Sequence, residues 1–389
     1  MSRDESDVLV VGGGIVGLAV ARALATGARP LSVRVLERED GVGRGQTRGN
    51  SGVVHAGVYY APGSLKARLC VEGARRLYAY CDHHAIPYQR CGKLIVAKDA
   101  SELPALDELE RRAGINGVPG MRRLAAEQIA EVEPHCVGVA ALHSPHTGIV
   151  QFPAVAEAMA GEVRDAGGTV ATGAGVEAVW TTADGIAVRH RSGQARARLA
   201  VFCAGLESDR MAVMAGGAPD PRIVPFRGAY LRLADEKADM VRGLIYPVPD
   251  PALPFLGVHL TRHMGGQVSL GPTALLVPRA GSLSWPGTWR MARRWWRTGV
   301  SELRHGVDRD GFAREAARYV PALAPADFEP WFAGRRAQAL GRDGALVDDF
   351  LIHETPRALH VRNAPSPAAT SSLAIADLIA DRARTALGA

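Results

Sequence analysis

The sequence predicts an α/β fold with two domains, and three observations support this prediction. An apolar strand, a glycine-rich turn and an Ala-rich helix open the chain between residues 7 and 25. Strand and helix patterns alternate again after residue 139, whereas proline- and aromatic-rich strand segments follow residue 221. With 389 residues, of which 47% are hydrophobic, the chain can bury the cores that two domains require.

The opening segment has the spacing of a dinucleotide-binding turn. An apolar strand leads to Gly12, Gly14 and Gly17, and a second strand ends at Glu37. Gly12 permits a tight turn, Gly14 lets the backbone approach a pyrophosphate at a helix N-terminus, and Gly17 permits close helix packing. Glu37 follows about 20 residues later, where a carboxylate can accept hydrogen bonds from the adenosine ribose. The spacing therefore predicts a Rossmann-like domain that binds a dinucleotide.

Further along the chain, the hydrophobic spacing predicts alternating helices and short strands. Helices are expected over residues 63–84, 102–113, 125–133 and 151–166, and strands over residues 89–97, 139–144, 169–179, 185–190 and 196–203. The last strand runs into Ala204 and Gly205. A turn of small residues here is typical either of a second close approach of the backbone to the dinucleotide or of an ordinary strand end.

The proline- and aromatic-rich strand segments from residue 221 onward predict a second, mostly antiparallel sheet that forms the wall of a ligand cleft. Residues 282–304 are expected to be largely helical and combine tryptophans with arginines. Such a helix either lies on an anionic membrane surface or is partly buried with solvated arginines. Near the C-terminus, a loop rich in Pro, Ala and Ser opens a helix at about Ala369, which supplies free N–H groups and a positive dipole end.

These segments divide the chain into a discontinuous first domain and a smaller second domain. The first is expected to comprise residues 1–85, 140–215 and 335–389, and the second residues 86–139 and 216–334.

Net charge and cysteine spacing argue against a nucleic-acid-binding protein and against a metal-binding protein. The net charge of +6 is spread along the chain without a basic stripe or a nucleic-acid-binding module, so we expect no nucleic-acid partner. The five cysteines show no metal-binding spacing, which predicts reduced thiols and no metal. We find neither a signal peptide nor a membrane-spanning run, and therefore expect a cytoplasmic protein, or one attached peripherally to the inner face of a membrane.

Several separated segments together resemble one family nearly end to end. These are the glycine fingerprint and residues 48–60, 62–67, 225–228, 246–249, 336–338 and 363–372. They are similar to the L-2-hydroxyglutarate oxidase/dehydrogenase branch of the FAD-dependent D-amino-acid-oxidase (DAO) superfamily. Three positions depart from the pattern of that branch. This chain has Gly265 where an acidic residue is usual, Thr273 where an asparagine is usual, and Arg335 where an apolar residue is usual.

The resemblance implies a flavoprotein whose first domain is a Rossmann-like FAD-binding domain of the glutathione-reductase-2 type. It also implies oxidation of an α-hydroxy dicarboxylate, L-2-hydroxyglutarate, to 2-oxoglutarate by hydride transfer to flavin N5. The residues expected to hold FAD are Gly12, Gly14, Gly17, Glu37, Arg38, Ser51, Gly52, Val53, Val176, Ala204, Gly205, Arg336, Pro367, Ala368, Ala369 and Thr370.

Removal of the hydroxyl proton needs a base beside the flavin, and a histidine whose pKa is near neutrality suits this task. His55 is the first candidate, because it lies in the segment expected to face the flavin; the alternative is a histidine that only bonds to backbone. His259 is the second candidate, unless it is simply a buried residue of the wall.

A substrate with two carboxylates needs cationic partners, and the guanidinium fork matches a carboxylate. Arg336 and Arg227 are expected to meet at the flavin, with Lys66 and Tyr60 near the entrance. Each of these side chains could instead form a surface ion pair, and for Lys66 we favour that alternative.

Two other functions remain open on sequence alone. A flavin amine oxidase acting on glycine or sarcosine would share the architecture and the carboxylate-binding arginines, and a dinucleotide-binding protein without catalytic activity would share the fingerprint. The electron acceptor, either dioxygen or a quinone, is not specified by the sequence.

Overall fold

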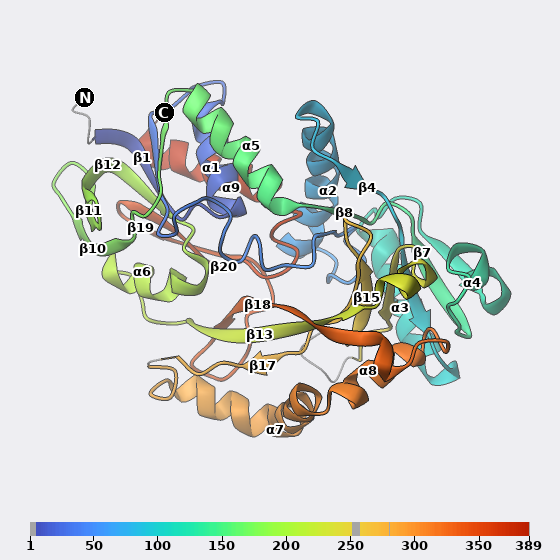
Figure 1. The fold of residues 1–389 in the computed structure, drawn as a ribbon. Coiled ribbons are helices and arrows are strands. Elements are labelled where there is room, and N and C mark those ends of the chain that lie inside the picture. The colour runs from blue at the N-terminus through green and yellow to red at the C-terminus, as the bar shows by residue number, and fades with distance from the viewer. Residues whose placement is uncertain (1–4, 251–256, 280, 389) are drawn as a thin grey trace.

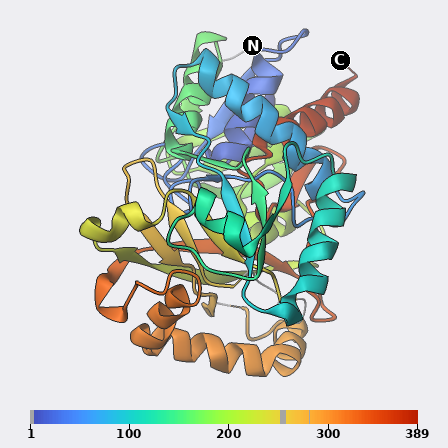
Figure 2. The same cartoon turned by 90° about the vertical axis from the view of Figure 1, so that its right-hand side faces the viewer.

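The computed structural model describes residues 5–250, 257–279 and 281–388. Two large β-sheets dominate these residues, and helices cover them on the outside (Figures 1 and 2). Both ends of the chain lie together beside the first sheet, at the upper left of Figure 1. The α/β prediction is therefore confirmed, with one largely parallel sheet and one largely antiparallel sheet.

The first sheet is built on β1 (Glu5–Val11), which pairs in parallel with β2 (Val33–Leu36) and β12 (Gly193–Phe202). The sheet continues through β9 (Thr169–Ala171) on one side and through β10 (Val176–Thr181), β11 (Ile186–His190), β19 (Leu351–Thr355) and β20 (Ala358–Asn363) on the other. Residues Val8 to Val11 are buried on both faces, as is typical of a central parallel strand.

Three helices cover one face of this sheet and form the main core with it: α1 (Ile15–Ala25), α5 (Phe152–Asp165) and α9 (Ser372–Leu387). The helix α2 (Leu65–His83) packs against α9, and α6 (Ser208–Met214) lies on the opposite side of the sheet. The first and last helices of the chain thus share one core, which explains why both chain ends belong to the same layer.

The second sheet has the strand order β17-β13-β16-β15-β14-β5-β7-β6, with β18 beside β13. Its strands are β5 (Lys93–Ala97), β6 (Arg122–Ala125), β7 (Ala140–Ser144), β13 (Arg222–Leu233), β14 (Leu244–Pro247), β15 (His259–Arg262), β16 (Val268–Gly271), β17 (Leu275–Leu276) and β18 (Phe328–Leu340). All its pairings are antiparallel except that of β14 with β5. Both β7 and β18 extend this sheet past the domain limits expected at residues 140 and 335, because hydrophobic spacing identifies a strand but not its partner.

Four helices flank the second sheet: α3 (Leu103–Ile115), α4 (Ala126–Val132), α7 (Pro286–Val307) and α8 (Arg309–Ala317). The helix α7 lies along the outer edge of the molecule, below β17 in Figure 1. A small third sheet, β3 (Val53–Val54), β8 (Gly148–Val150) and β4 (Tyr88–Gln89), holds the segment of residues 50–60 in place. The helix expected over residues 282–304 is confirmed, and the last helix begins at Ser372 rather than at Ala369.

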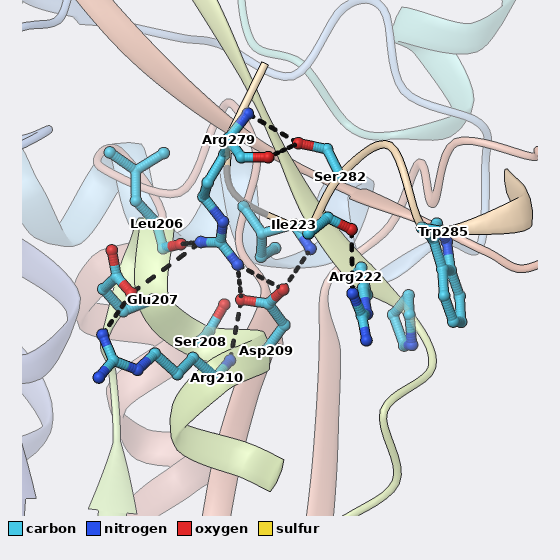
Figure 3. A network of polar contacts seen from close by, with 12 residues as sticks. Leu206, Glu207, Ser208, Asp209, Arg210, Arg222, Ile223, Arg279, Ser282 and Trp285 are labelled. Carbon is cyan, nitrogen blue, oxygen red and sulfur yellow. Dashed lines mark hydrogen bonds and ion pairs between the residues drawn. The ribbon is translucent and has the colours of Figure 1, made fainter. Parts of the chain in front are cut away.

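A buried ion pair joins the two layers (Figure 3). The two carboxylate oxygens of Asp209 in α6 both accept hydrogen bonds from Nη2 of Arg279, at 2.8 and 2.7 Å, and Oδ2 also accepts one from the backbone N–H of Ile223 in β13. Arg279 donates a further bond to the carbonyl of Leu206, and its own backbone N–H donates to Ser282. The Asp209 side chain is only 6% exposed, so this carboxylate depends on its partners.

Asp209→Ala should therefore lower the free energy of unfolding by roughly 3 kcal/mol, because it leaves Nη2 of Arg279 and the Ile223 N–H without their Asp209 acceptor. The measurement is chemical denaturation of the purified protein. The control is Glu315→Ala, which removes an exposed pair with Arg318 and should cost less than about 1 kcal/mol. Equal losses in the two variants would show that the Asp209 network does not join the layers.

Candidate active site

A continuous cleft runs from the glycine turn to the wall formed by the second sheet. Its outer part, the outer cleft, is lined by Glu37, Arg38, Val176 and residues 203–207. Its inner part, the inner pocket, is lined by residues 14–17, 46–55, 334–337 and 361–370, although not by every residue in each range. Both parts share Gly14, Thr47 and Gly205 as wall residues. The cleft lies at the carboxyl ends of β1 and β12, where ligands of parallel sheets bind.

Backbone packing at the turn leaves no room for side chains. Gly12 has a φ of +113°, and a Cβ atom there would lie 2.4 Å from the Cys203 carbonyl oxygen. A Cβ atom on Gly17 would lie 2.0 Å from the Gly12 carbonyl oxygen. The turn, α1 and the end of β12 are thus in direct backbone contact, as the dinucleotide fingerprint predicts.

The Glu37 carboxylate is oriented so that it can accept hydrogen bonds from a ribose. Its Oε2 atom accepts a hydrogen bond from the Gly13 N–H at 2.6 Å, and its Oε1 atom accepts one from the Glu39 N–H at 2.9 Å. Each carboxylate oxygen keeps a further lone pair for a hydroxyl group in the outer cleft. The outer cleft therefore suits an adenosine with a free 2′-hydroxyl, as FAD carries.

Residues 47–55 are fixed from two sides. The Thr47 hydroxyl accepts a bond from the Ile15 N–H at the start of α1, and the Asn50 side chain bonds to the Thr47 carbonyl and the Gly52 N–H. On the other side, the Thr370 hydroxyl accepts from the His55 N–H at 3.0 Å and donates to the Val53 carbonyl at 3.3 Å. These bonds hold residues 47–55 between the start of α1 and the C-terminal loop, around the inner pocket.

The loop before α9 supplies hydrogen-bond donors of the kind that bind a flavin ring. Pro367, Ala368, Ala369 and Thr370 all line the inner pocket, as do Ser51 and Val53. The hydroxyl groups of Ser371 and Ser372 are buried with no partner among the described residues. Small side chains, backbone N–H groups and the positive end of α9 fit a flat ring that gains negative charge on reduction. The residues present thus fit FAD along the whole cleft.

His55 is a wall residue of the inner pocket. Its Nε2 atom lies 3.3 Å from the Ser366 hydroxyl, and its Nδ1 atom is buried without a partner in the described part of the chain. Burial lowers the pKa of His55 to about 3, helped by the charges of Lys93 and Arg336. The ring is therefore uncharged and able to accept a proton, although its pKa is lower than the neutral value that we expected from the sequence.

His259 lies deeper than His55. Its Nδ1 atom is 2.8 Å from the Gly257 carbonyl, to which it donates when Nδ1 carries the proton, and its ring stacks on Tyr246 with centroids 3.9 Å apart. Burial lowers its pKa to about 3 as well. His259 is absent from the inner-pocket wall that the described residues define, so His55 remains the better placed of the two histidines.

Of the two arginines predicted to bind the substrate, only one lines the inner pocket. Arg336 of β18 lines the inner pocket, opposite Phe226 of β13. Arg227 is exposed, because Phe226 and Gly228 occupy the pocket side of β13 and adjacent strand residues point to opposite faces. The structure thus brings Arg336, but not Arg227, to the site.

Lys66 and Tyr60 also lie outside the inner pocket. Lys66 forms an ion pair with the exposed Asp348 at 2.8 Å, although the Lys66 side chain itself is only 9% exposed. Its ammonium lies 5.6 Å from the centroid of the Tyr60 ring. Burial holds the pKa of Tyr60 well above its ordinary value, so its hydroxyl stays protonated.

Two further pocket residues were not predicted as site residues. Tyr230 lines the inner pocket from β13, and Thr273 lines it while accepting a bond from the Ala229 N–H. Lys93, in an otherwise apolar strand, lies beside the two histidines. A single lysine within the sequence Cys-Gly-Lys-Leu-Ile-Val-Ala was the available signal for this position.

Comparison with known proteins agrees with this geometry. The family model described as "FAD dependent oxidoreductase" (DAO) matches residues 7–382. The chain belongs to this family. The FAD cofactor and the class of enzyme, an FAD-dependent oxidoreductase, are thereby confirmed.

Two relatives show how far the similarity extends. A protein of Homo sapiens named "L-2-hydroxyglutarate dehydrogenase, mitochondrial" is 44% identical over 411 residues, covering 98% of this chain and 89% of the relative. A protein of Indibacter alkaliphilus named "L-2-hydroxyglutarate dehydrogenase" is 41% identical over 389 residues, covering 96% of this chain and 98% of the relative. The similarity to the branch that the sequence resembled is therefore confirmed.

Solved structures share the fold at lower identity. L-α-glycerophosphate oxidase from Mycoplasma pneumoniae with FAD bound has a TM-score of 0.79 at 21% identity, covering 98% of this chain and 95% of that chain. Glycine oxidase from Geobacillus kaustophilus has a TM-score of 0.73 at 19% identity, with the same coverage. At this identity the likeness establishes the fold alone.

The Glu37 carboxylate gives the cofactor assignment a direct test. Glu37→Gln should weaken FAD binding about tenfold, because hydrogen bonds to a charged acceptor exceed those to a neutral amide by about 1 kcal/mol or more. The measurement is titration of the FAD-free protein with FAD by calorimetry. Glu127→Gln, which changes an exposed residue of α4 outside the cleft, is the control and should leave the affinity unchanged. Equal affinity of Glu37→Gln and the unaltered protein would contradict the assignment.

Proposed function

We propose that this chain oxidises L-2-hydroxyglutarate to 2-oxoglutarate. The observation that carries the proposal is the inner pocket itself, in which an uncharged histidine and a guanidinium face the loop before α9. The relatives named for this reaction share 41–45% identity over nearly the whole chain, which supports the same substrate here.

Each pocket residue has a task in this reaction. Arg336 binds the carboxylate next to the hydroxyl-bearing carbon, since its planar fork matches two carboxylate oxygens. His55 accepts the hydroxyl proton on a ring nitrogen, and Thr370 holds the His55 backbone in place. FAD supplies the two-electron acceptor that takes the hydride from the carbon atom. The C–H and O–H bonds break, and the carbon–oxygen bond becomes a carbonyl.

The low pKa of His55 is consistent with this task once the substrate is bound. Positive neighbours lower the pKa of a histidine, and negative charges raise it. A dicarboxylate beside Lys93 and Arg336 compensates the charges that hold the pKa of His55 at about 3. The proton affinity of the base therefore increases when the substrate is present.

Anaerobic reduction of the flavin tests substrate and base together. L-2-Hydroxyglutarate should bleach the flavin absorbance, whereas D-2-hydroxyglutarate, glycine and sarcosine should not. His55→Ala should keep its FAD but be reduced about 10²- to 10⁴-fold more slowly, as expected for loss of a general base. His135→Asn, an exposed histidine, is the control. Bleaching by glycine or sarcosine alone would show a flavin amine oxidase instead.

We also propose that α7 contacts an anionic membrane surface, where a quinone could accept the electrons. Trp289 and Trp296 are 62% and 59% exposed, and exposed Arg293 and Arg297 share this helix. Indole rings and arginines together suit the interface of an anionic bilayer. Among the described residues, no helix is both long and apolar enough to cross a membrane. This would place a cytoplasmic protein on the inner face of the membrane.

Sedimentation with lipid vesicles tests this contact. The protein should pellet with vesicles that contain an anionic lipid, less so at high salt, and Trp289→Ser combined with Trp296→Ser should release it. Trp180→Ser, a partly exposed indole on β10, is the control. Full recovery of the unaltered protein in the supernatant would contradict the proposal.

A further inference from the structure

Lys93 occupies a place where a charge is costly. It begins β5, whose five residues are all buried, and the lysine itself is 1% exposed. The strands β14 and β7 flank it on either side, so Lys93 lies within the second sheet rather than at an edge. Burial of a lone ammonium ion costs several kcal/mol unless a partner compensates it.

Two aromatic rings are the contacts of this ammonium that the structure records. Its Nζ atom lies 4.5 Å from the centroid of the Tyr59 ring and 5.1 Å from that of Tyr246. Within the described ranges, no carboxylate forms an ion pair with Lys93 and no acceptor forms a hydrogen bond with it. The rings offset only part of the lost hydration, and burial lowers the pKa of Lys93 to about 7.

Other polar groups near Lys93 also lack partners. The Tyr59 hydroxyl and the His55 Nδ1 atom are both buried without a hydrogen-bond partner in the part of the chain that the structure describes. Both residues come from the same short segment, and the His55 ring also lines the inner pocket. Lys93 and Arg336 both act electrostatically on His55 and His259. The cluster is thus rich in donors and positive charge, with no anion among its described members.

A purely structural role does not explain this arrangement. A core position between two tyrosine rings could be filled by methionine, which has a similar length and no charge to desolvate. A donor cluster that surrounds an uncharged base is instead typical of a site that an anion completes. The anion that the proposed reaction supplies is a carboxylate of the substrate.

We propose that Lys93 binds the second carboxylate of the substrate, the one farther from the reacting carbon, with the Tyr59 hydroxyl as an additional donor. Arg336, on the wall of the inner pocket, takes the carboxylate next to the hydroxyl group, and Lys93, which acts electrostatically on His55 of that wall, takes the other end. This inference rests on the proposed function and extends it. It assigns to Lys93 the discrimination of a dicarboxylate from a monocarboxylate of equal length.

Binding of two unreactive ligands separates this role from the chemistry. Glutarate has five carbons and two carboxylates, pentanoate has five carbons and one, and neither has a hydroxyl group to oxidise. In FAD-loaded protein, Lys93→Met should weaken glutarate binding about 10- to 100-fold and change pentanoate binding less than about twofold, as expected for loss of a charged hydrogen bond. The measurement is the change in flavin absorbance or the heat on titration.

Two matched variants complete the series. Lys93→Arg keeps the charge and should recover part of the preference for glutarate. Lys98→Met alters a lysine beyond the end of the same strand, paired with Glu102, and should bind both ligands normally. If Lys93→Met binds glutarate as tightly as the unaltered protein, or loses both ligands equally, Lys93 does not bind the second carboxylate.

The unaltered protein offers an independent measurement in case Lys93→Met does not fold. Above a pKa of about 7 the ammonium loses its proton, so glutarate affinity should fall about tenfold per pH unit while pentanoate affinity stays flat. The titratable or charged groups around Lys93 are His55, Tyr59, Cys70, Tyr246, His259 and Arg336. Both histidines are uncharged across this range, and burial raises the pKa of the two tyrosines and of Cys70 above their ordinary values.

The test of Lys93 can fail independently of the test of the proposed reaction. A glutarate affinity that is flat from pH 6 to 9 would overturn the role of Lys93. Failure of L-2-hydroxyglutarate to reduce the flavin would overturn the proposed function, while the difference between glutarate and pentanoate binding would still test Lys93.

Discussion

The arrangement of the site depends on the hydrogen bonds that the Thr370 hydroxyl makes with His55 and Val53. They join the loop before the last helix to the segment that follows the second strand, between residues that are 315 and 317 positions apart in the sequence. The same loop supplies the small residues of the inner pocket, and the same segment supplies the histidine. Because α1 and α9 share one core, the two halves of the pocket are anchored to the same hydrophobic core. The position of His55 is thus a consequence of how the two chain ends pack.

The selectivity that we propose for this pocket depends on its electrostatics. Burial keeps His55 and His259 uncharged, and the positive groups Lys93 and Arg336 reinforce this effect. Under the proposed function, a substrate with two carboxylates supplies the anion that these groups lack and raises the pKa of His55. Binding and proton removal are in this way linked through the same charges. The Asp209 and Arg279 pair, at the junction of the two layers, keeps the wall that carries Arg336 in register with the cofactor cleft.

Much of this was readable in the sequence, and the exceptions have physical causes. The glycine fingerprint, Glu37 and the loop at Pro367 were predicted because each depends on local backbone geometry or a nearby helix end, whereas His55 was chosen because the family resemblance implies that its segment faces the flavin. Arg227 was misplaced relative to the pocket because a strand does not reveal which of its faces is covered. Lys93 was overlooked because a lysine in an apolar strand acquires meaning only from the rings and histidines that the fold brings to it, which come from distant segments. The Asp209 and Arg279 pair likewise joins residues that no local pattern connects.

A crystal structure of the FAD-loaded protein with 2-oxoglutarate would test the central claim most directly. The account predicts one carboxylate at Arg336, the other at Lys93 and Tyr59, and the keto oxygen within hydrogen-bonding distance of His55. A ligand whose carboxylates both lie away from Arg336 and Lys93, or whose keto group faces neither His55 nor the flavin, would contradict it.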